Sequence, residues 1–370
     1  MNFFWVFSIV SYLNTAIFKK AAAFEDITNM DILIIKLGAM GDVVRTTSLL
    51  PGLFKKYPGA RIFWVTKRES LPLLEHNPFL QQSTAIEERE QIKELGKKNF
   101  ALAINLDDEM ESCTLASSVR ASERIGGILQ DGKPSYTKGS SPWFDLGLIS
   151  RFGKEKADEL KKKNTRTYQD IISGIVGVER GKPVLELTEE EAGFGEEFTK
   201  RHSISKSNLV IGLNTAAGSR WKGKILSVEK TIGLAKELSK NFSCTLLLFG
   251  GPQERGRNGT IARELGNLIV DAGTDHPLRE FAALVNLCDI LITSDSLALH
   301  LGVALGKNVI VFFGPTSAAE IDLYGRGIKL KSKKHCGCFY NDNCTVRPWC
   351  TETIPLEDFV NGVKELRHHG

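Results

Sequence analysis

Short apolar runs alternate with helix-length amphipathic segments along this chain, and the alternation occurs twice. In the first half the apolar runs predict buried strands at residues 32–37, 61–66 and 101–106, with a helix at 43–57. In the second half they predict strands at residues 209–214, 245–249, 268–271, 290–293 and 309–313, with helices at 228–240, 259–265, 278–287 and 298–305. Such alternation produces parallel sheets with right-handed crossovers, so the predicted fold class is α/β with two doubly wound domains.

A charged stretch at residues 179–208 separates the two halves. We place the boundary inside it, which gives a first domain over residues 30–190 and a second domain over 191–355. Open parallel sheets bind ligands beyond the carboxyl ends of their strands. Two facing domains of this kind therefore predict a ligand-binding cleft between them.

The composition excludes several classes of protein. The chain of 370 residues is 42% hydrophobic and 25% charged, which does not fit a disordered chain, a collagen-like fibre or a multi-span membrane protein. The net charge of +4 is too small to indicate a nucleic-acid binder. A basic run at residues 154–166, with Lys161, Lys162 and Lys163, is either a solvated helix face or a surface for anionic lipid or an acidic acceptor.

The first 29 residues form a hydrophobic extension. Residues 2–18 are apolar and aromatic and are followed by Lys19-Lys20, without the features of a signal peptide. Three interpretations stay open: a membrane anchor, a helix that lies in the membrane interface or packs on the protein, and an unused upstream start before Met30.

A turn of small residues, Gly38-Ala39-Met40-Gly41-Asp42, follows the first strand and opens a helix. It is neither the G-x-G-x-x-G dinucleotide fingerprint nor a P-loop, which argues against NAD binding and ATP hydrolysis. Asp42 is either a helix cap or a catalytic carboxylate at the rim of the cleft. Backbone amides and the helix dipole would lower its pKa and keep it ionised.

Three further loops follow strands of the second half. Residues 214–224 combine small residues with cations near a helix start, which is typical of a phosphate cradle but also of a solvated basic loop. In the loop at 249–254, Glu254 could accept hydrogen bonds from a ribose or cap the next helix. Asp295 and Ser296 are good helix caps, His300 lies one turn further on, and the strand at 309–313 runs into Gly314-Pro315-Thr316. These loops converge on one rim with cations, a carboxylate and hydroxyls.

The ordered set of motifs resembles glycosyltransferase family 9, the heptosyltransferase-like family of lipopolysaccharide assembly. The matching segments are ILIIKLGAMGDVVRTTSLLPGL with YPGARIFWV, NTAAGSRWKGK, LLLFGGPQE and DILITSDSLALHLGVALGKNVIVFFGPT. The resemblance implies a GT-B architecture, with an N-terminal acceptor domain and a C-terminal nucleotide-sugar domain. It also implies that a C-terminal helix, residues 356–370, packs back on the N-terminal domain.

The resemblance assigns roles by position. It makes Asp42 the general base, puts Lys224 near the donor diphosphate and Glu254 near the donor ribose, and matches Asp295, His300 and Thr316 to donor motifs. With these we group Thr215, Ser296 and Gly314 on the donor side, and Gly41 and Arg45 on the acceptor side. Leu226-Ser227 and Leu297 depart from the family's pattern and put the identity of the donor in question.

The implied activity is inverting, metal-independent transfer of a sugar from a nucleotide-sugar donor, with heptose from ADP-heptose expected. The implied acceptor is a lipopolysaccharide core or a related lipid-linked saccharide at the inner-membrane surface. This predicts a cytoplasmic enzyme, peripheral to the membrane, that needs no cofactor for catalysis and binds no nucleic acid. The alternatives are a non-catalytic GT-B protein that binds nucleotide sugars and a GT-B enzyme that uses another nucleotide sugar.

Four cysteines, Cys336, Cys338, Cys344 and Cys350, crowd into the tail loop at residues 336–350. They could hold a structural zinc ion tetrahedrally, form disulfides, or remain reduced thiols. A similar Cys-rich tail occurs in part of the family that this chain resembles.

Overall fold

The computed structural model describes residues 30–205, 207–218, 222–333, 339–340 and 344–367. Outside the described residues lie the hydrophobic extension at residues 1–29, Arg220 of the loop at 214–224, and two of the four tail cysteines, Cys336 and Cys338. Within the described part of the chain, no helix is both long and apolar enough to cross a membrane.

The N-terminal domain is built on a six-stranded sheet with the order β3-β2-β1-β4-β5-β6. Its strands are β1 (Asp31–Ile35), β2 (Arg61–Thr66), β3 (Leu80–Ala85), β4 (Asn99–Asn105), β5 (Arg120–Gln130) and β6 (Lys133–Tyr136). All neighbours pair in parallel except β5 and β6, which form an antiparallel hairpin. β1 is buried along its whole length, as its uninterrupted apolar run predicts for a central parallel strand.

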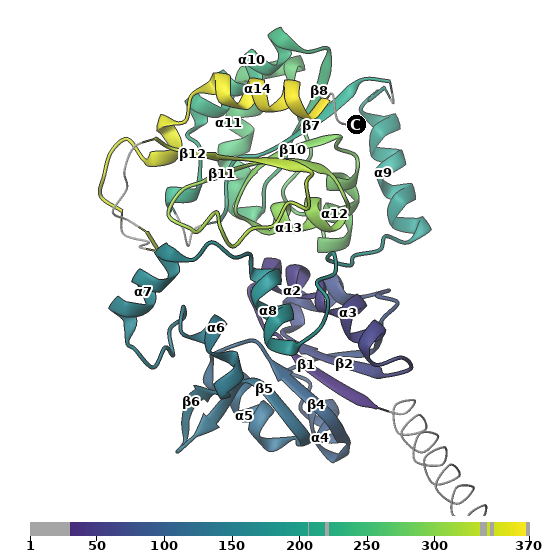
Figure 1. Ribbon diagram of the computed structural model, residues 1–370. Helices are drawn as coiled ribbons and strands as arrows, with labels where there is room; N and C mark the ends of the chain where they lie inside the picture. The colour runs from purple at the N-terminus through teal and green to yellow at the C-terminus, as the bar shows by residue number, and fades with distance from the viewer. Residues whose placement is uncertain (1–29, 206, 219–221, 334–338, 341–343, 368–370) are drawn as a thin grey trace, which may run out of the picture.

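Helices cover both faces of this sheet (Figure 1). They are α2 (Met40–Thr46), α3 (Leu49–Lys56), α4 (Arg89–Lys97), α5 (Met110–Ser118), α6 (Ser141–Phe144), α7 (Lys154–Lys163) and α8 (Tyr168–Val176). α3 and α8 bury their apolar faces with one side of β1 and β2, whereas α4 and α5 pack with the other side. The single helix predicted over 43–57 is two helices, because the backbone N–H groups of Thr47 and Ser48 bond only three residues back.

The C-terminal domain repeats the design with an all-parallel sheet of order β12-β11-β10-β7-β8-β9. The strands are β7 (Leu209–Asn214), β8 (Cys244–Leu248), β9 (Val270–Asp271), β10 (Ile290–Ser294), β11 (Asn308–Phe313) and β12 (Gly327–Lys331). The helices are α9 (Glu189–Arg201), α10 (Val228–Asn241), α11 (Arg255–Leu265), α12 (Leu278–Asn286), α13 (Leu297–Ala304) and α14 (Leu356–Arg367). One face of the sheet packs against α9, α12 and α13, and the other against α10, α11 and α14.

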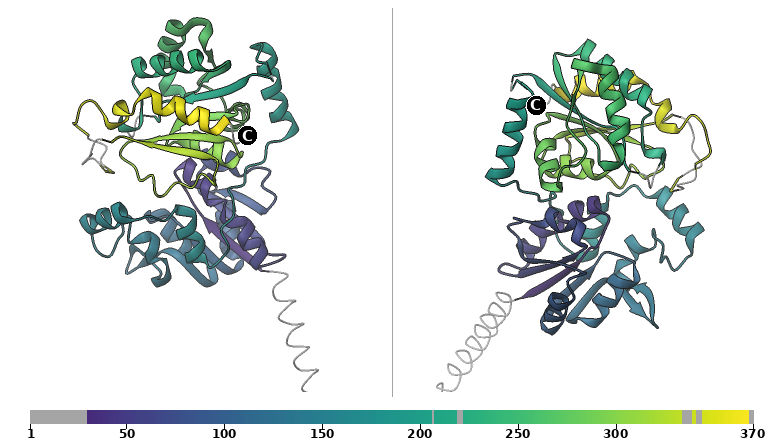
Figure 2. Two further views of the ribbon diagram at one scale, coloured as in Figure 1. Left: turned by 45° about the horizontal axis from the view of Figure 1, so that its top comes forward. Right: turned by 180° about the vertical axis from the view of Figure 1, so that it is seen from behind.

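The C-terminal helix does not pack on the N-terminal domain, and that prediction is wrong. α14 contacts α10, β11 and β12, all within the C-terminal domain. Its apolar face buries Phe359, Val360, Val363 and Leu366 in the core of that domain. Both views of Figure 2 show α14, in yellow, lying on the C-terminal domain.

The two domains meet through α2 and α13, which lie against each other between the two sheets (Figure 1). Val44 of α2 joins the apolar cluster of the C-terminal domain, and Met40 packs against it. A connecting segment leads from α8 to α9, and Arg180 within it forms a 2.5 Å ion pair with Asp322. α9 falls inside the charged stretch, residues 179–208, in which the sequence analysis placed the domain boundary. A Thr188–Glu191 capping box starts this helix. The carboxyl ends of β1, β7 and β10 thus point toward one shared region.

Candidate active site

Asp42 lies in the first turn of α2, just beyond the carboxyl end of β1. One-third of its side chain is exposed, and its Oδ1 is 2.8 Å from the Arg45 guanidinium one turn further on. No side-chain hydrogen bond caps the N-terminus of α2 in the structure. The interpretation of Asp42 as a helix cap is therefore not supported, and the carboxylate is accessible at the interface between the domains.

Positive charges hold Asp42 in its ionised form. Burial alone would raise the pKa of Asp42, but the charges of Arg45 and Lys36 outweigh it and lower the pKa below its ordinary value. Lys36 is itself buried at the end of β1 and is paired with Asp107, which also accepts from the Leu37 backbone N–H. Sequence reasoning missed Lys36, although a single lysine in the apolar strand ILIIKL was a visible signal.

On the opposite domain, Lys224, Asp295 and His300 form one chain of contacts. The Lys224 ammonium donates to the Asp295 carboxylate at 2.8 Å and to the Asp295 backbone oxygen at 2.9 Å. His300 Nε2 lies 3.7 Å from the other oxygen of Asp295. Burial, and after it the nearby charge of Arg45, lowers the pKa of His300 to about 4, so the imidazole is neutral at pH 7.

Two glycines allow the backbone segments of the site to approach closely. A Cβ added to Gly41 would lie 2.4 Å from Cδ2 of His300, so α2 and α13 fit together only because residue 41 has no side chain. A Cβ added to Gly314 would lie 2.0 Å from the backbone oxygen of Gly223. Gly314 therefore lets the Gly-Pro-Thr turn pack directly on the loop that carries Lys224.

A cavity of about 430 Å³ opens between the domains beside these residues. Residues 39–41 of the N-terminal domain line one side, and the loops after β7, β8, β9 and β10, with the starts of α12 and α13, line the rest. Glu254 and Ser296 contribute to its wall. The Glu254 carboxylate also accepts from the Gly251 backbone N–H at 2.9 Å, so it serves as a cap while facing the cavity. The volume and mixed polarity of the cavity suit a nucleoside-sized ligand.

Two of the predicted donor residues, Glu254 and Ser296, line this cavity, and the others do not: Thr215, Lys224, Asp295, His300, Gly314 and Thr316. The Thr215 hydroxyl is fully buried and bonds to Thr231 at 3.0 Å and to Arg257 at 2.9 Å. Its neighbours Asn214 and Ala216 line the cavity, but Thr215 does not, because its side chain points into the domain core. The assignment of its side chain to the donor is therefore corrected. Thr316 lies on the Gly-Pro-Thr turn, and its hydroxyl is buried without a partner in the structure.

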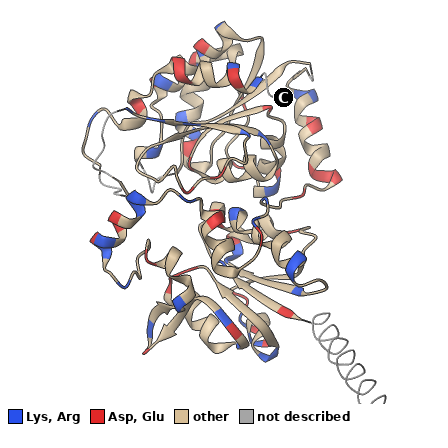
Figure 3. Ribbon diagram, viewed as in Figure 1, with Lys and Arg blue, Asp and Glu red and all other residues tan. Residues whose placement is uncertain are grey.

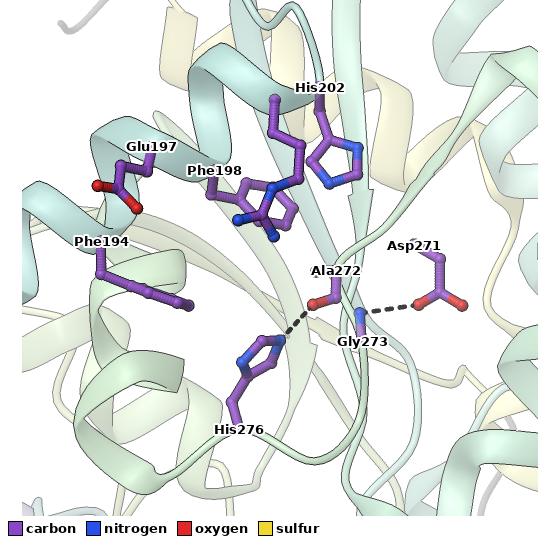
Figure 4. Close-up of a pocket in the computed structure, with 9 residues that line it drawn as sticks. Phe194, Glu197, Phe198, His202, Asp271, Ala272, Gly273 and His276 are labelled. Carbon is purple, nitrogen blue, oxygen red and sulfur yellow. Dashed lines mark hydrogen bonds between the residues drawn. The ribbon is translucent and has the colours of Figure 1, made fainter.

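A second cavity of about 190 Å³ lies on the outer side of the C-terminal domain, between α9 and the loop after β9 (Figure 4). It is lined by aromatic and charged side chains, including Phe194, Phe198 and Asp271. His276 borders both cavities, and its Nε2–H donates to the Ala272 carbonyl at 2.6 Å. None of the predicted site residues lines this second cavity.

Groups from three segments distant in the chain interact electrostatically with Arg45, and of these the sequence analysis singled out only Lys161. The Arg45 guanidinium carbon lies 3.9 Å from the centroid of the Tyr168 ring on α8. Lys161 of α7 lies 3.7 Å from the centroid of the Tyr340 ring, whose hydroxyl bonds to Glu320 at 3.1 Å. Figure 3 shows the lysines of α7, the basic run of the sequence, on a helix that reaches toward the C-terminal domain. No local motif could have signalled contacts between residues so far apart in the chain.

Of the four tail cysteines, the structure describes Cys344 and Cys350, both as free thiols. Among the described residues, no cluster of three or more His, Cys, Asp or Glu side chains could hold a metal ion. The zinc site that was predicted at the four cysteines therefore depends on residues outside the described part.

The model of the family described as glycosyltransferase family 9 (heptosyltransferase) matches residues 89–347, well over half of the chain. The chain belongs to glycosyltransferase family 9. A curated relative, lipooligosaccharide heptosyltransferase 2 of Haemophilus influenzae, is 22% identical over 78% of this chain and 84% of its own length.

Solved structures of family 9 proteins share the fold. A family 9 glycosyltransferase from Veillonella parvula superposes with a TM-score of 0.76 at 20% identity, over 92% of this chain and 98% of that one. The ADP-heptose lipopolysaccharide heptosyltransferase II of E. coli gives 0.65 at 18% identity, over 92% and 100%. The GT-B architecture and the glycosyltransferase activity that the motifs implied are thereby confirmed.

Proposed function

We propose that this glycosyltransferase moves a heptose from ADP-heptose to a lipopolysaccharide core or related lipid-linked acceptor, with inversion and without a catalytic metal. The observation that carries the proposal is the facing of Asp42, from the acceptor domain, and the Lys224–Asp295–His300 chain, from the donor domain, across one interface. The identity of the donor and acceptor rests on the names of the family and its relatives.

The donor occupies the larger cavity in this proposal. The nucleoside lies against residues 216–218 and 250–254, with Glu254 accepting from ribose hydroxyls. Lys224 then turns its ammonium from Asp295 to the diphosphate, supported by backbone amides of the Gly-Pro-Thr turn that packs on the same loop. The loss of one buried ion pair is offset by a new one with the ligand.

The transfer step moves one proton and one glycosyl group. The acceptor hydroxyl gives its proton to Asp42 while its oxygen bonds to C1 of the sugar from the face opposite the diphosphate. The bond from C1 to the phosphate oxygen breaks, and its electron pair leaves with ADP. Attack from the opposite face inverts the configuration at C1.

Cationic side chains take the role that a metal ion has in other transferases. Developing negative charge on the leaving diphosphate is stabilised by Lys224, the last residue of a short 3-10 helix at Lys222–Lys224. The sequence contains no Asp-x-Asp pair of the kind that holds a metal at a diphosphate. The reaction is expected to run at full rate in excess chelator, which tests this part separately.

A donor panel with product analysis tests the proposed function. ADP-heptose, ADP-glucose and UDP-sugars are each incubated with a lipooligosaccharide core acceptor, and release of the nucleotide and the anomeric configuration of the product are measured. ADP release only with ADP-heptose and acceptor together, with an inverted product, is expected. Tight donor binding without transfer to any core acceptor would contradict the proposal.

A structural zinc at Cys336, Cys338, Cys344 and Cys350 stays a prediction. We expect metal analysis of gently purified protein to find one zinc per chain and mutation of Cys350 to release it. Protein free of zinc and iron would contradict it.

A further inference from the structure

Three buried cations at the centre of the interface each have an internal carboxylate as a partner. Lys36 pairs with Asp107, Arg45 with Asp42, and Lys224 with Asp295. An anionic substrate thus meets no unpaired charge among these three cations. An anion that binds one of them competes with its carboxylate.

Arg45 has features that suit such an exchange. Its side chain is nine-tenths buried, yet its Nε is a buried donor without a hydrogen-bond partner in the structure. Buried guanidinium donors are rarely left unbonded, so this atom indicates a missing acceptor of hydrogen bonds. The flat face of the guanidinium rests on the Tyr168 ring, which leaves its edge as the part that binds a planar or tetrahedral anion.

We propose that a carboxylate or phosphate of the acceptor, beside its nucleophilic hydroxyl, takes Arg45 from Asp42 and so frees Asp42 to act as the base. This inference rests on the proposed function and adds a condition to it. Without the acceptor's anion, Asp42 stays in an ion pair with Arg45 and is a weak base. With the anion bound, Arg45 forms its two parallel hydrogen bonds with the substrate and no longer pairs with Asp42.

The other charged groups around Asp42 stay in place during the exchange. They are Lys36 on β1, Asp107 after β4, Lys161 on α7, Tyr168 on α8, and Asp295 and His300 at the start of α13. Lys36 keeps its pair with Asp107, and His300 stays neutral near pH 7. Arg45 is the group bonded directly to the Asp42 carboxylate, so its movement changes the basicity of Asp42 most.

The test compares three forms of one acceptor: the core oligosaccharide, the same preparation with its carboxyls methyl-esterified, and a phosphatase-treated sample. Arg45→Gln is compared with wild type, with the exposed Arg89→Gln on α4 as a matched control and Arg45→Lys as the conservative variant. We expect the wild type and Arg89→Gln to lose about 10- to 100-fold in kcat/KM when the critical anion is removed. The arm that shows the loss identifies carboxylate or phosphate.

Arg45→Gln should be equally slow with all three acceptors, and Arg45→Lys should regain part of the preference. A general structural role would lower the rate without removing the discrimination. Equal use of all three acceptors by the wild type would overturn the inference and leave the proposed function standing. Retained discrimination in Arg45→Gln would overturn it as well, whereas no ADP release with any acceptor would contradict the proposed function itself.

The pH profile of the wild type provides a readout that needs no variant. The acidic limb of kcat/KM reports the free enzyme, where Asp42 is paired, and the limb of kcat reports the complex, where Asp42 is free. We expect the kcat limb to lie at higher pH when the anionic acceptor is used. If the acidic limbs of the kcat and kcat/KM profiles of the wild type lie at the same pH, the proposed exchange of Arg45 between Asp42 and the acceptor is contradicted.

Discussion

Lys224 holds an aspartate of its own domain in this structure, and its proposed task is to hold a diphosphate. Lys224→Met removes the charge while keeping a similar length. We expect ADP affinity to fall about tenfold or more, since hydrogen bonds to charged groups contribute about 1.5–3 kcal/mol. Calorimetric titration with ADP measures this, with the exposed Lys236→Met as the control. Unchanged affinity would remove Lys224 from the donor site.

His300 provides a pH-dependent test of the packing at the interface. Its pKa is lowered to about 4 in the folded state, against an ordinary value near 6.5, so the unfolded chain binds the proton more tightly. The folded state therefore loses stability as the pH falls from 6.5 to 4, by on the order of 3 kcal/mol from this group.

Chemical denaturation of wild type and His300→Gln at pH 7.5 and 4.5 tests this predicted loss of stability at low pH. The variant is expected to lose less stability on acidification than the wild type. An equal loss in both proteins would show that His300 is not held neutral by its surroundings.

The candidate site was partly predictable from single residues. Asp42, Glu254 and Asp295 each follow a strand, and parallel sheets bring such positions to one edge. Arg45's aromatic platform and the Lys161–Tyr340 contact were not predictable, because their partners lie more than a hundred residues away in the chain. The side chain of Thr215 points inward because Arg257 and Thr231 offer it hydrogen bonds that no motif shows.

At the scale of elements, the contact between α2 and α13 holds the two halves of the candidate site together. Gly41→Ala would place a methyl group against the His300 ring, and overpacking of this kind costs about 1–3 kcal/mol. We expect a lower melting temperature and a loss of turnover, because the two helices must move apart.

Gly193→Ala in α9 is the matched control, since a Cβ there meets nothing within 4 Å. It should leave turnover unchanged and keep or raise the melting temperature. Gly41→Ala with the turnover of the wild type would mean that the close approach of α2 and α13 is not needed for catalysis.

Central strands were predicted well, whereas of the four edge strands only β9 was predicted. The strands at 61–66 and 209–214 were predicted with the bounds of β2 and β7, because buried parallel strands are continuous apolar runs. β3, with the sequence LQQSTA, and β6, with KPSY, are polar edge strands without such a run. The place of α14 was wrong because amphipathicity shows that a helix has a buried face but not which domain receives it.

At the scale of the molecule, the two domains contribute different residues to the candidate site. The N-terminal domain supplies Asp42 and Arg45, and the C-terminal domain supplies Lys224, Asp295 and His300. In the proposed mechanism neither set catalyses transfer alone, so the relative position of the domains controls whether the site is complete. The solved family 9 structures share this GT-B fold.

The most direct test of this account is the paired measurement of turnover and donor affinity in Asp42→Asn, with Glu111→Gln on α5 as the control. Asp42→Asn should lower kcat by about 10²- to 10⁴-fold, the usual contribution of a general base, and leave ADP-heptose affinity within about twofold of wild type. Turnover close to that of the wild type would show that Asp42 is not the base and would contradict the central claim.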